Sequence, residues 1–229
     1  MPAKPHERQY RSLLSPLAPV STGVEKRFES DFYVEGYAST FNDPYLLYKA
    51  WDGTEVYEVI SPDAFADADM SDVIFQFDHS GRVYARQSNG TLVVEPQLHG
   101  LFVAADLGST SVSREMYEDI AAGLVTRMSW AFMPDWDSIE DVYDEEANRL
   151  TSTIHRVERV YDVSAVSLPA DPNTEISARS YFDGEIERIA AERLQSALEA
   201  TKASNELRRR RMVLRAKAIQ LRQQGGFGC

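Results

Sequence analysis

Between residues 28 and 168 the chain consists mostly of short runs in which apolar and polar residues alternate. A period of two is typical of β-strands that bury one face. Turn-forming residues such as Asn42-Asp43-Pro44 and Trp51-Asp52-Gly53 separate these runs. The pattern predicts strands at 32–38, 55–60, 73–79, 91–95, 100–106, 125–133, 150–154 and 157–168.

Two segments follow the helical period of three to four residues instead. The first covers 110–124, with Ser111 or Ser113 as the expected N-cap. The second covers roughly 183–223, with an apolar stripe in its first half and leucines seven residues apart in its second half. Another helix is expected to begin at Pro62, because proline after serine is typical of a first helical turn.

These patterns divide the chain into three expected parts. Residues 1–27, rich in Pro, Ser and charge, are expected to form a flexible arm. Residues 28–180 are expected to form one globular domain, and residues 181–229 a helical tail. The predicted fold class is α+β and β-rich, with antiparallel sheet and a few helices before the tail.

Charge separates the tail from the body. The whole chain has a net charge of -12, but residues 183–229 contain 10 Lys/Arg and 6 Asp/Glu, which gives +4. An acidic body does not favour nucleic acid as the partner. The basic run 208–211 is expected to dock on an acidic surface of a partner protein.

Cysteine content and hydropathy indicate the compartment in which the protein is expected to reside. The sole cysteine is Cys229, so the chain offers neither an internal disulfide nor a cysteine-based metal site. We find no signal-peptide pattern, and no apolar run approaches the roughly 18 residues of a membrane span. A soluble intracellular protein without membrane partner, metal or cofactor is expected. The acidic cluster at 135–146 lacks the spacing of a calcium loop and is expected to be an exposed hairpin.

Three residues in or beside strand-like runs are candidates for a Ser/His/acid relay: Ser129, His79 and Asp162. A serine hydroxyl becomes a good nucleophile when an imidazole takes its proton and a third group orients that imidazole. The alternatives are an ordinary serine on a polar strand face, a hydrogen-bonded histidine, and a surface ion pair of Asp162 with Arg156 or Arg159. Strand alternation places Arg127 on the Ser129 face and a bulky apolar set at 128, 130 and 132 on the other.

A set of short motifs in a fixed order along the chain supports the relay over its alternatives. Over about residues 30–180 the chain resembles the prohead (capsid maturation) serine proteases of tailed bacteriophages. The matching segments are, in order, Glu35-Gly36-Tyr37-Ala38, Pro62-Asp63-Ala64-Phe65, Phe75-Gln76-Phe77-Asp78-His79, Gly100-Leu101, Ile120-Ala121-Ala122-Gly123, Met128-Ser129-Trp130 and the acid-Val-Ser signature at 162–172.

The resemblance implies a fold similar to herpesvirus assembly proteases, a closed antiparallel β-barrel ringed by helices. It implies Ser129 as nucleophile, His79 as general base and acid, and Asp162 as the residue that orients His79. The family pattern more often has Glu at this third position, and His155 is the alternative third member because the herpesvirus relatives use a second histidine. Arg127 or backbone N–H groups would then bind the oxyanion.

The resemblance also implies a function. We expect a serine endopeptidase that cleaves scaffold and major capsid protein segments inside the procapsid, in the host cytoplasm, and that processes itself. The tail would serve targeting or assembly, and a homo-oligomer is expected by analogy. The alternatives are a capsid scaffold or protease–scaffold fusion with a degenerate site, and a β-barrel binding module without a viral role.

Overall fold

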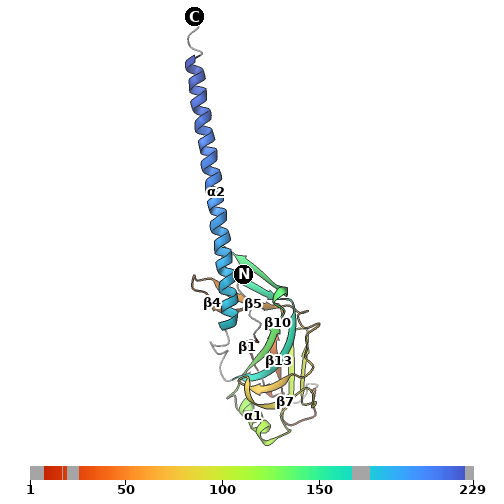
Figure 1. Ribbon diagram of the computed structural model, residues 1–229. Helices are drawn as coiled ribbons and strands as arrows, with labels where there is room; N and C mark the ends of the chain where they lie inside the picture. The colour runs from red at the N-terminus through yellow and green to blue at the C-terminus, as the bar shows by residue number, and fades with distance from the viewer. Residues whose placement is uncertain (1–7, 17, 20–25, 167–175, 225–229) are drawn as a thin grey trace. The chain divides into compact units, whose positions relative to one another are not determined.

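The computed structural model describes residues 8–16, 18–19, 26–166 and 176–224 (Figure 1). The chain forms two compact units, Met1–Phe182 and Asp183–Cys229. The first holds the strands and helix α1 (Ser111–Ala121). The second holds most of helix α2 (Ile176–Gln224).

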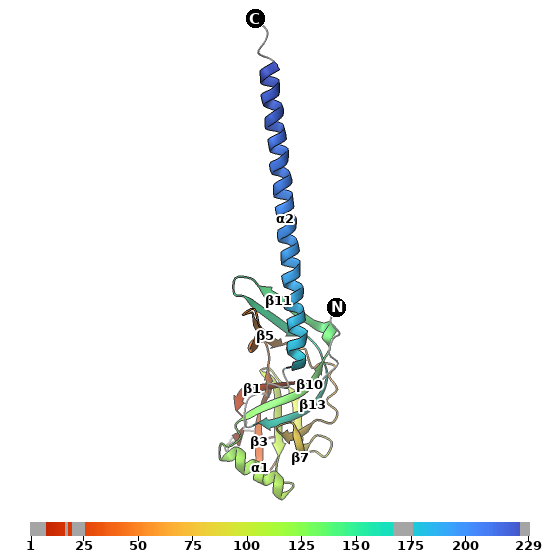
Figure 2. The same ribbon diagram turned by 60° about the vertical axis from the view of Figure 1, so that its left-hand side comes forward.

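Three sheets build the first unit. The sheet that carries the candidate site has, in spatial order, β1 (Gln9–Pro16), β10 (Arg127–Pro134), β13 (Val157–Val166), β6 (Ile74–Phe77) and β7 (Ser80–Arg86). The second has β11 (Ile139–Asp144), β12 (Arg149–Ile154), β5 (Glu55–Ile60) and β4 (Tyr45–Lys49). The third has β2 (Ala18–Pro19), β3 (Tyr33–Thr40), β9 (Gly100–Asp106) and β8 (Leu92–Pro96). Both views show α1 at one end of this unit and the β11–β12 hairpin at the other (Figures 1 and 2).

The β-rich α+β class is confirmed, but the closed antiparallel barrel is not. The described strands form three open sheets, and β13 with β6 and β12 with β5 are parallel pairs. Parallel neighbours need a long crossover in the chain, and here β7 to β12 lie between β6 and β13. Alternation in a sequence predicts that a segment is a strand but not which strand pairs with it. The sequence alone therefore could not show whether the predicted strands close into a barrel.

The core lies on one face of β10. Met128, Trp130 and Phe132 are at most 1% exposed, as their alternation with Ser129 predicted. The Trp130 ring stacks on Phe132, with centroids 3.8 Å apart and planes 9° apart, and it also contacts Phe65. Apolar residues from all three sheets and from α1 pack around this stack. The core face of β10 is therefore fixed by packing.

Residues 1–27 are expected from the sequence to form a flexible arm, but Gln9–Pro16 within this range forms strand β1. This strand pairs antiparallel with β10 and places Ser12 opposite Ser129. A short polar segment that contains prolines resembles a loop in the sequence. Its backbone hydrogen bonds come from a partner far away in the chain, which local pattern cannot reveal.

The predicted helix at 110–124 is α1, with a different cap. Thr110 is the N-cap, and its side-chain oxygen accepts a hydrogen bond from the Ser113 backbone N–H at 3.0 Å. Gly123 has φ +73°, which stops the helix in the conformation that glycine adopts most easily. The helix expected at Pro62 is not formed, since residues 62–67 make successive turns instead.

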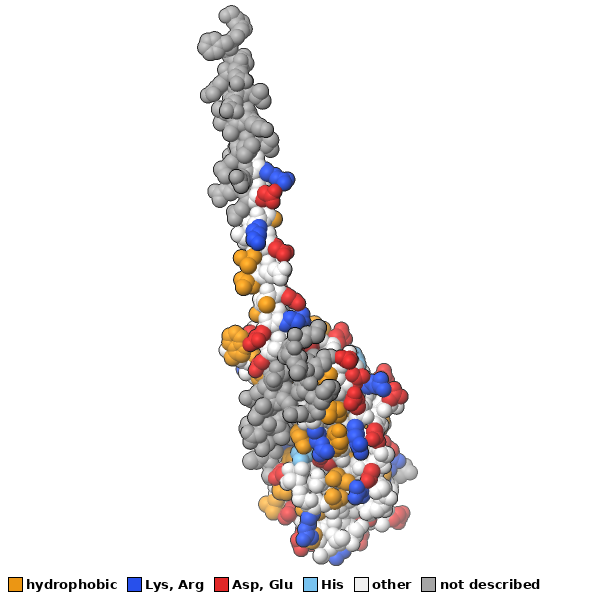
Figure 3. Space-filling model, in the orientation of Figure 1, with side chains coloured by type: hydrophobic (Ala, Val, Ile, Leu, Met, Phe, Trp, Pro, Cys, Tyr) orange, Lys and Arg blue, Asp and Glu red, His pale blue; other side chains and the backbone are white. Residues whose placement is uncertain are grey.

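Helix α2 confirms that the tail is helical. Acidic and basic side chains alternate along its described part (Figure 3), and Arg188 pairs with both Glu185 and Glu192. Leu194, Leu198 and Leu207 are more than half exposed. Within the described residues, no helix has the length and apolar character to cross a membrane.

Trp130→Ala tests the core. We expect a loss of about 3–5 kcal/mol in the free energy of unfolding, because the substitution empties a fully packed position. Urea denaturation followed by circular dichroism measures it. Trp51→Ala is the matched control, since Trp51 is 75% exposed, and its loss should be below about 0.5 kcal/mol. Equal losses in both variants would contradict the assignment of Trp130 to the core.

Candidate active site

Ser129, His79 and Asp162 come together on the face of β10 that is turned away from the core. His79 Nε2 lies 2.5 Å from Ser129 Oγ, and His79 Nδ1 lies 2.6 Å from Asp162 Oδ1. Ser129 and Asp162 are each 1% exposed, and the His79 side chain is 14% exposed. The three residues form a continuous hydrogen-bonded chain from carboxylate to hydroxyl.

A tight hairpin loop positions His79. Phe77 of β6 pairs with Ser80 of β7, so Asp78 and His79 are the two loop residues. Both have positive φ, 45° and 56°, which is typical of a type I′ turn. The Asp78 N–H donates to the Ala165 carbonyl at 3.0 Å. The loop is thus fastened to β13, which holds the imidazole over the strand that carries Asp162.

A β-bulge turns Asp162 toward the site. The register of β13 on β10 shifts between Ala131, which faces Asp162, and Phe132, which faces Val160, so Tyr161 is the extra residue. Val160 can then lie in the core while Asp162, two residues later, lies on the opposite face. Bulges commonly redirect a side chain next to an active site.

The buried Asp162 carboxylate is held by several groups. Oδ1 accepts hydrogen bonds from His79 and from the Ser164 hydroxyl, which is 2.8 Å away. Oδ2 accepts no hydrogen bond from any residue that the structure describes, but Arg8 Nη1 lies 3.8 Å from it. A buried carboxylate is strongly disfavoured unless it is paired in this way. Arg159, considered from the sequence as a surface partner of Asp162, pairs with Asp69 instead.

The donors and acceptors that these side chains offer determine which way the protons point along the relay. An ionised carboxylate can only accept, so His79 Nδ1 carries the proton and donates to Asp162. In the neutral imidazole, Nε2 is then the acceptor for the Ser129 hydroxyl proton. The arrangement can therefore remove a proton from Ser129. The hydroxyl also has a second acceptor, the Arg11 carbonyl oxygen at 2.9 Å.

Two other sequence candidates are not part of this cluster. His155 is 46% exposed and pairs with Glu140 at 3.1 Å. Arg127 lies at the start of β10, opposite Val166, and its side chain has no hydrogen bond or ion pair with any residue that the structure describes. The geometry thus assembles His79, Ser129 and Asp162, and leaves His155 outside.

Arg8 and two residues of β1, none of them a candidate from the sequence, surround the relay. The Tyr10 ring contacts the His79 ring edge-on, with centroids 4.7 Å apart, and Arg8 and Arg11 reach Asp162 and Ser129. The sequence carries no signal for them, because the local pattern of residues 8–16 is that of an irregular segment. Ser164 could have been found, since it follows Asp162 by two residues in a strand and shares its face.

A buried charged cluster lies beside the site. Arg11 and Glu58 are at most 5% exposed, and Nε and Nη2 of Arg11 donate to the two Glu58 oxygens at 2.7 and 2.6 Å. The Tyr45 hydroxyl donates to Glu58 as well. Burial is the largest single influence on Arg11 and lowers its pKa, but the charges of Glu58 and Tyr45 and the hydrogen bonds to them together outweigh burial and raise that pKa. Burial, followed by the Glu58 charge, raises the pKa of Tyr45 well above its usual value.

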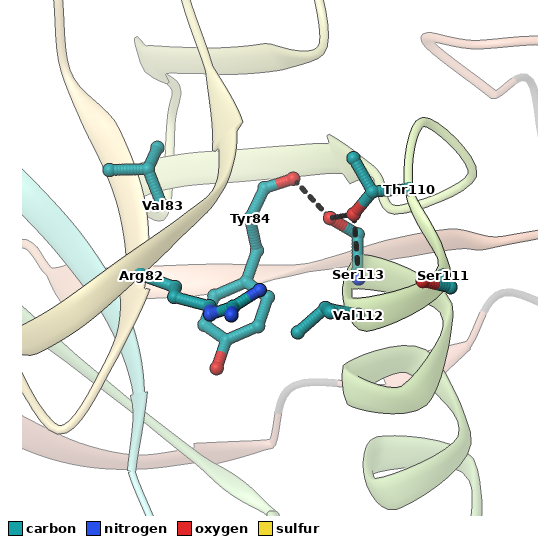
Figure 4. A pocket seen from close by; sticks show the side chains of 7 residues that line it. All are labelled: Arg82, Val83, Tyr84, Thr110, Ser111, Val112 and Ser113. Atoms are coloured by element: carbon teal, nitrogen blue, oxygen red, sulfur yellow. Dashed lines mark hydrogen bonds between the residues drawn. The ribbon is translucent and has the colours of Figure 1, made fainter.

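A pocket elsewhere on this unit has a structural explanation. Residues 82–84 of β7 and 110–113 at the start of α1 line it (Figure 4). The Ser113 hydroxyl donates to the Tyr84 carbonyl at 2.9 Å and so ties the helix to the sheet. No residue of the relay lines this pocket. Within the described part of the chain, no group of three or more His, Cys, Asp or Glu residues is placed to hold a metal ion.

A Ser–His–Asp relay on a β-rich domain is the arrangement by which serine peptidases activate their nucleophile. The family model described as caudovirus prohead serine protease matches residues 22–186, more than half of the chain. The chain therefore belongs to this family, which confirms the resemblance found in its motifs. No curated protein and no solved structure matches the chain significantly.

Ser164→Ala tests the support of the Asp162 carboxylate. The substitution removes one hydrogen bond to a buried charge, so we expect the free energy of unfolding to fall by about 1–2 kcal/mol. Ser71→Ala is the control, because the Ser71 hydroxyl donates to Asp69 Oδ1 at 2.7 Å in an exposed setting. Its loss should stay within about 0.5 kcal/mol in the same urea titration. A larger effect at Ser71 than at Ser164 would show that the buried bond does not support the carboxylate.

Proposed function

We propose that this chain is a serine endopeptidase that cleaves scaffold and major capsid protein segments during prohead maturation, inside the procapsid in the host cell. The observation that supports it most is the unbroken hydrogen-bonded chain from Asp162 through His79 to Ser129. It occurs in a member of a prohead serine protease family. A non-catalytic scaffold would have no need of a buried carboxylate aligned on a histidine.

The proposed mechanism follows from the direction of the relay. Ser129 Oγ attacks the carbonyl carbon of the scissile bond while His79 Nε2 takes its proton. Asp162 stabilises the imidazolium that forms and keeps the proton of Nδ1 in place. His79 then gives its proton to the leaving amine, and an acyl-enzyme remains on Ser129. Water, activated by His79, hydrolyses this ester and restores the serine.

The developing oxyanion needs preorganised hydrogen-bond donors aimed at the position that it will occupy. Arg127 stays our candidate, because it lies two residues before Ser129 on β10 and its side chain has no described polar partner. Backbone N–H groups are the alternative. The tail is proposed as a targeting or assembly segment, since Leu194, Leu198 and Leu207 of α2 are exposed. A homo-oligomer remains part of the proposal.

Ser129→Ala tests the proposed nucleophile. Wild type and variant are each co-expressed with the major capsid protein and scaffold of the same phage, and intact-mass spectrometry follows the products. We expect cleavage with wild type and with the Ser71→Ala control, and none with Ser129→Ala, because loss of the nucleophile lowers kcat by on the order of 10⁶. Cleavage by folded Ser129→Ala protein would refute the mechanism.

Asp162→Asn tests which residue orients His79. An amide in place of the carboxylate can favour the wrong imidazole tautomer, so we expect the cleavage rate to fall by on the order of 10⁴. His155→Gln should leave the rate within about twofold, because His155 pairs with Glu140 away from the relay. Initial rates on purified capsid protein provide the comparison. The opposite ranking would assign the third position to His155.

A further inference from the structure

Strand β1 and the residue before it, Arg8, contact all three residues of the relay. Arg8 lies beside Asp162, the Tyr10 ring contacts the His79 ring, and the Arg11 carbonyl oxygen lies 2.9 Å from Ser129 Oγ. Ser129 is consequently only 1% exposed. No other polypeptide can reach the Ser129 hydroxyl while β1 is in place. Strand β1 therefore occupies the position where a substrate has to bind.

The strand also has the orientation of a substrate. It pairs antiparallel with β10 and places Ser12 opposite Ser129. Addition of an extended segment to a sheet edge is a common mode of peptide recognition, in which the backbone supplies affinity and pockets for alternate side chains supply specificity. The Arg11 carbonyl carbon is one bond, about 1.2 Å, from its oxygen. That carbon therefore lies within about 4 Å of Ser129 Oγ.

The Arg11 side chain enters a built pocket. It leaves β1 on the face opposite Tyr10 and Ser12, where both Glu58 carboxylate oxygens accept its hydrogen bonds. The Tyr45 hydroxyl bonds to the same carboxylate, and the guanidinium carbon lies 5.6 Å from the Phe132 ring centre. Glu58 is 1% exposed. The pocket thus presents a buried negative charge to whichever side chain precedes the bond at Ser129.

This pocket selects arginine on physical grounds. A buried carboxylate left without a cation is strongly unfavourable, so a neutral side chain in the pocket would leave Glu58 uncompensated. The two parallel hydrogen bonds match the planar fork of a guanidinium, whereas a lysine ammonium offers only a point charge. An acidic side chain would be repelled. Arginine is therefore the best occupant, lysine the second, and neutral or acidic residues are excluded.

We propose that β1 is bound as a substrate of its own active site and that Glu58 makes the enzyme cleave after arginine, with Arg11–Ser12 as the first bond cut. This inference rests on the proposed peptidase function. It adds a substrate class, peptide bonds that follow arginine, and a reason for self-processing. The cut divides β1, and loss of residues 1–11 frees the Glu58 pocket and the edge of β10 from Trp130 to Phe132 for capsid and scaffold segments. Strand β1 lies before the residues 22–186 that the family model matches.

The proposed cut is an ordinary hydrolysis with water as co-reactant. Ser129 Oγ bonds to the Arg11 carbonyl carbon, and its proton passes to His79. The bond between that carbon and the Ser12 nitrogen then breaks, and His79 protonates the amine. Water cleaves the Arg11–Ser129 ester through His79, which leaves an Arg11 carboxylate, a free Ser12 amine and the original serine.

The test is intact-mass spectrometry of the full chain over time, with Arg11 and Glu58 varied. We expect wild type to lose residues 1–11, and Ser129→Ala to stay whole. Arg11→Lys should slow the cut by about tenfold and Arg11→Gln by at least about a hundredfold, because the second leaves the buried carboxylate unpaired. Arg27→Ala is the matched control, since Arg27 makes an exposed ion pair with Glu95; it should be cut at the wild-type rate.

Exchange of the charges of Arg11 and Glu58 separates an effect on cleavage specificity from an effect on folding. Glu58→Arg alone should block the cut, and it risks misfolding because two buried cations would face each other. The double variant Arg11→Glu with Glu58→Arg restores the ion pair in the reverse sense. We expect it to unfold in urea near the wild-type midpoint and to be cut between residues 11 and 12. A folded double variant that is never cut there would overturn the proposal.

Cleavage-site mapping on the co-expressed capsid protein and scaffold separates this inference from the proposed function. Cuts that follow arginine in wild type support both. Cuts that depend on Ser129 but follow neutral or acidic residues would overturn the arginine pocket and leave the peptidase standing. No cut in any protein, including the chain itself, would overturn both.

Discussion

The pairing of β10 with β13 is the interaction on which the rest of the site depends. Strand β10 turns Trp130 and Phe132 into the core and Ser129 to the opposite face. Strand β13 follows the same division, and its bulge at Tyr161 turns Asp162 to the Ser129 side while Val160 stays buried in the core. Since one pair of strands supplies both the core and two members of the relay, any shift in register would disrupt packing and chemistry together.

Charge burial is the second constraint, and residues 8–16 supply the compensating cations. Asp162 and Glu58 are both 1% exposed, and the arginines that approach them are Arg11 of β1 and Arg8, which lies directly before that strand. Loss of residues 1–11 would take the Arg11 carbonyl away from Ser129 and also withdraw both guanidinium groups from these carboxylates. The relay keeps its support from Ser164 in that case. The Glu58 pocket would then favour a new cation, which is what an arginine-containing substrate provides.

The position of His79 depends on the backbone conformation of Asp78 and His79. Two consecutive non-glycine residues with positive φ are uncommon, and they occur here at the tip of the β6–β7 hairpin. The strained loop is held by the bond from the Asp78 N–H to Ala165. Such strain is tolerated where the surroundings over-determine the conformation, which is frequent at functional sites. The imidazole is thus fixed from two sides, by its own loop and by the Asp162 carboxylate.

The sequence by itself determined the strand-rich body, helix α1, the helical tail, the buried face of β10 and the choice of Ser129, His79 and Asp162 as the candidate relay. Those features depend on local period and on ordered motifs, which can be seen without knowledge of neighbours. The tertiary structure alone decided the three open sheets with their parallel pairs, the bulge at Tyr161 and the place of β1. Strand partners and registers arise from contacts between distant segments, and a segment such as Gln9–Pro16 has no alternating pattern that would reveal its partner. For the same reason the pairing of Arg11 with Glu58, 47 residues apart in the chain, could only be found once the fold brought them together.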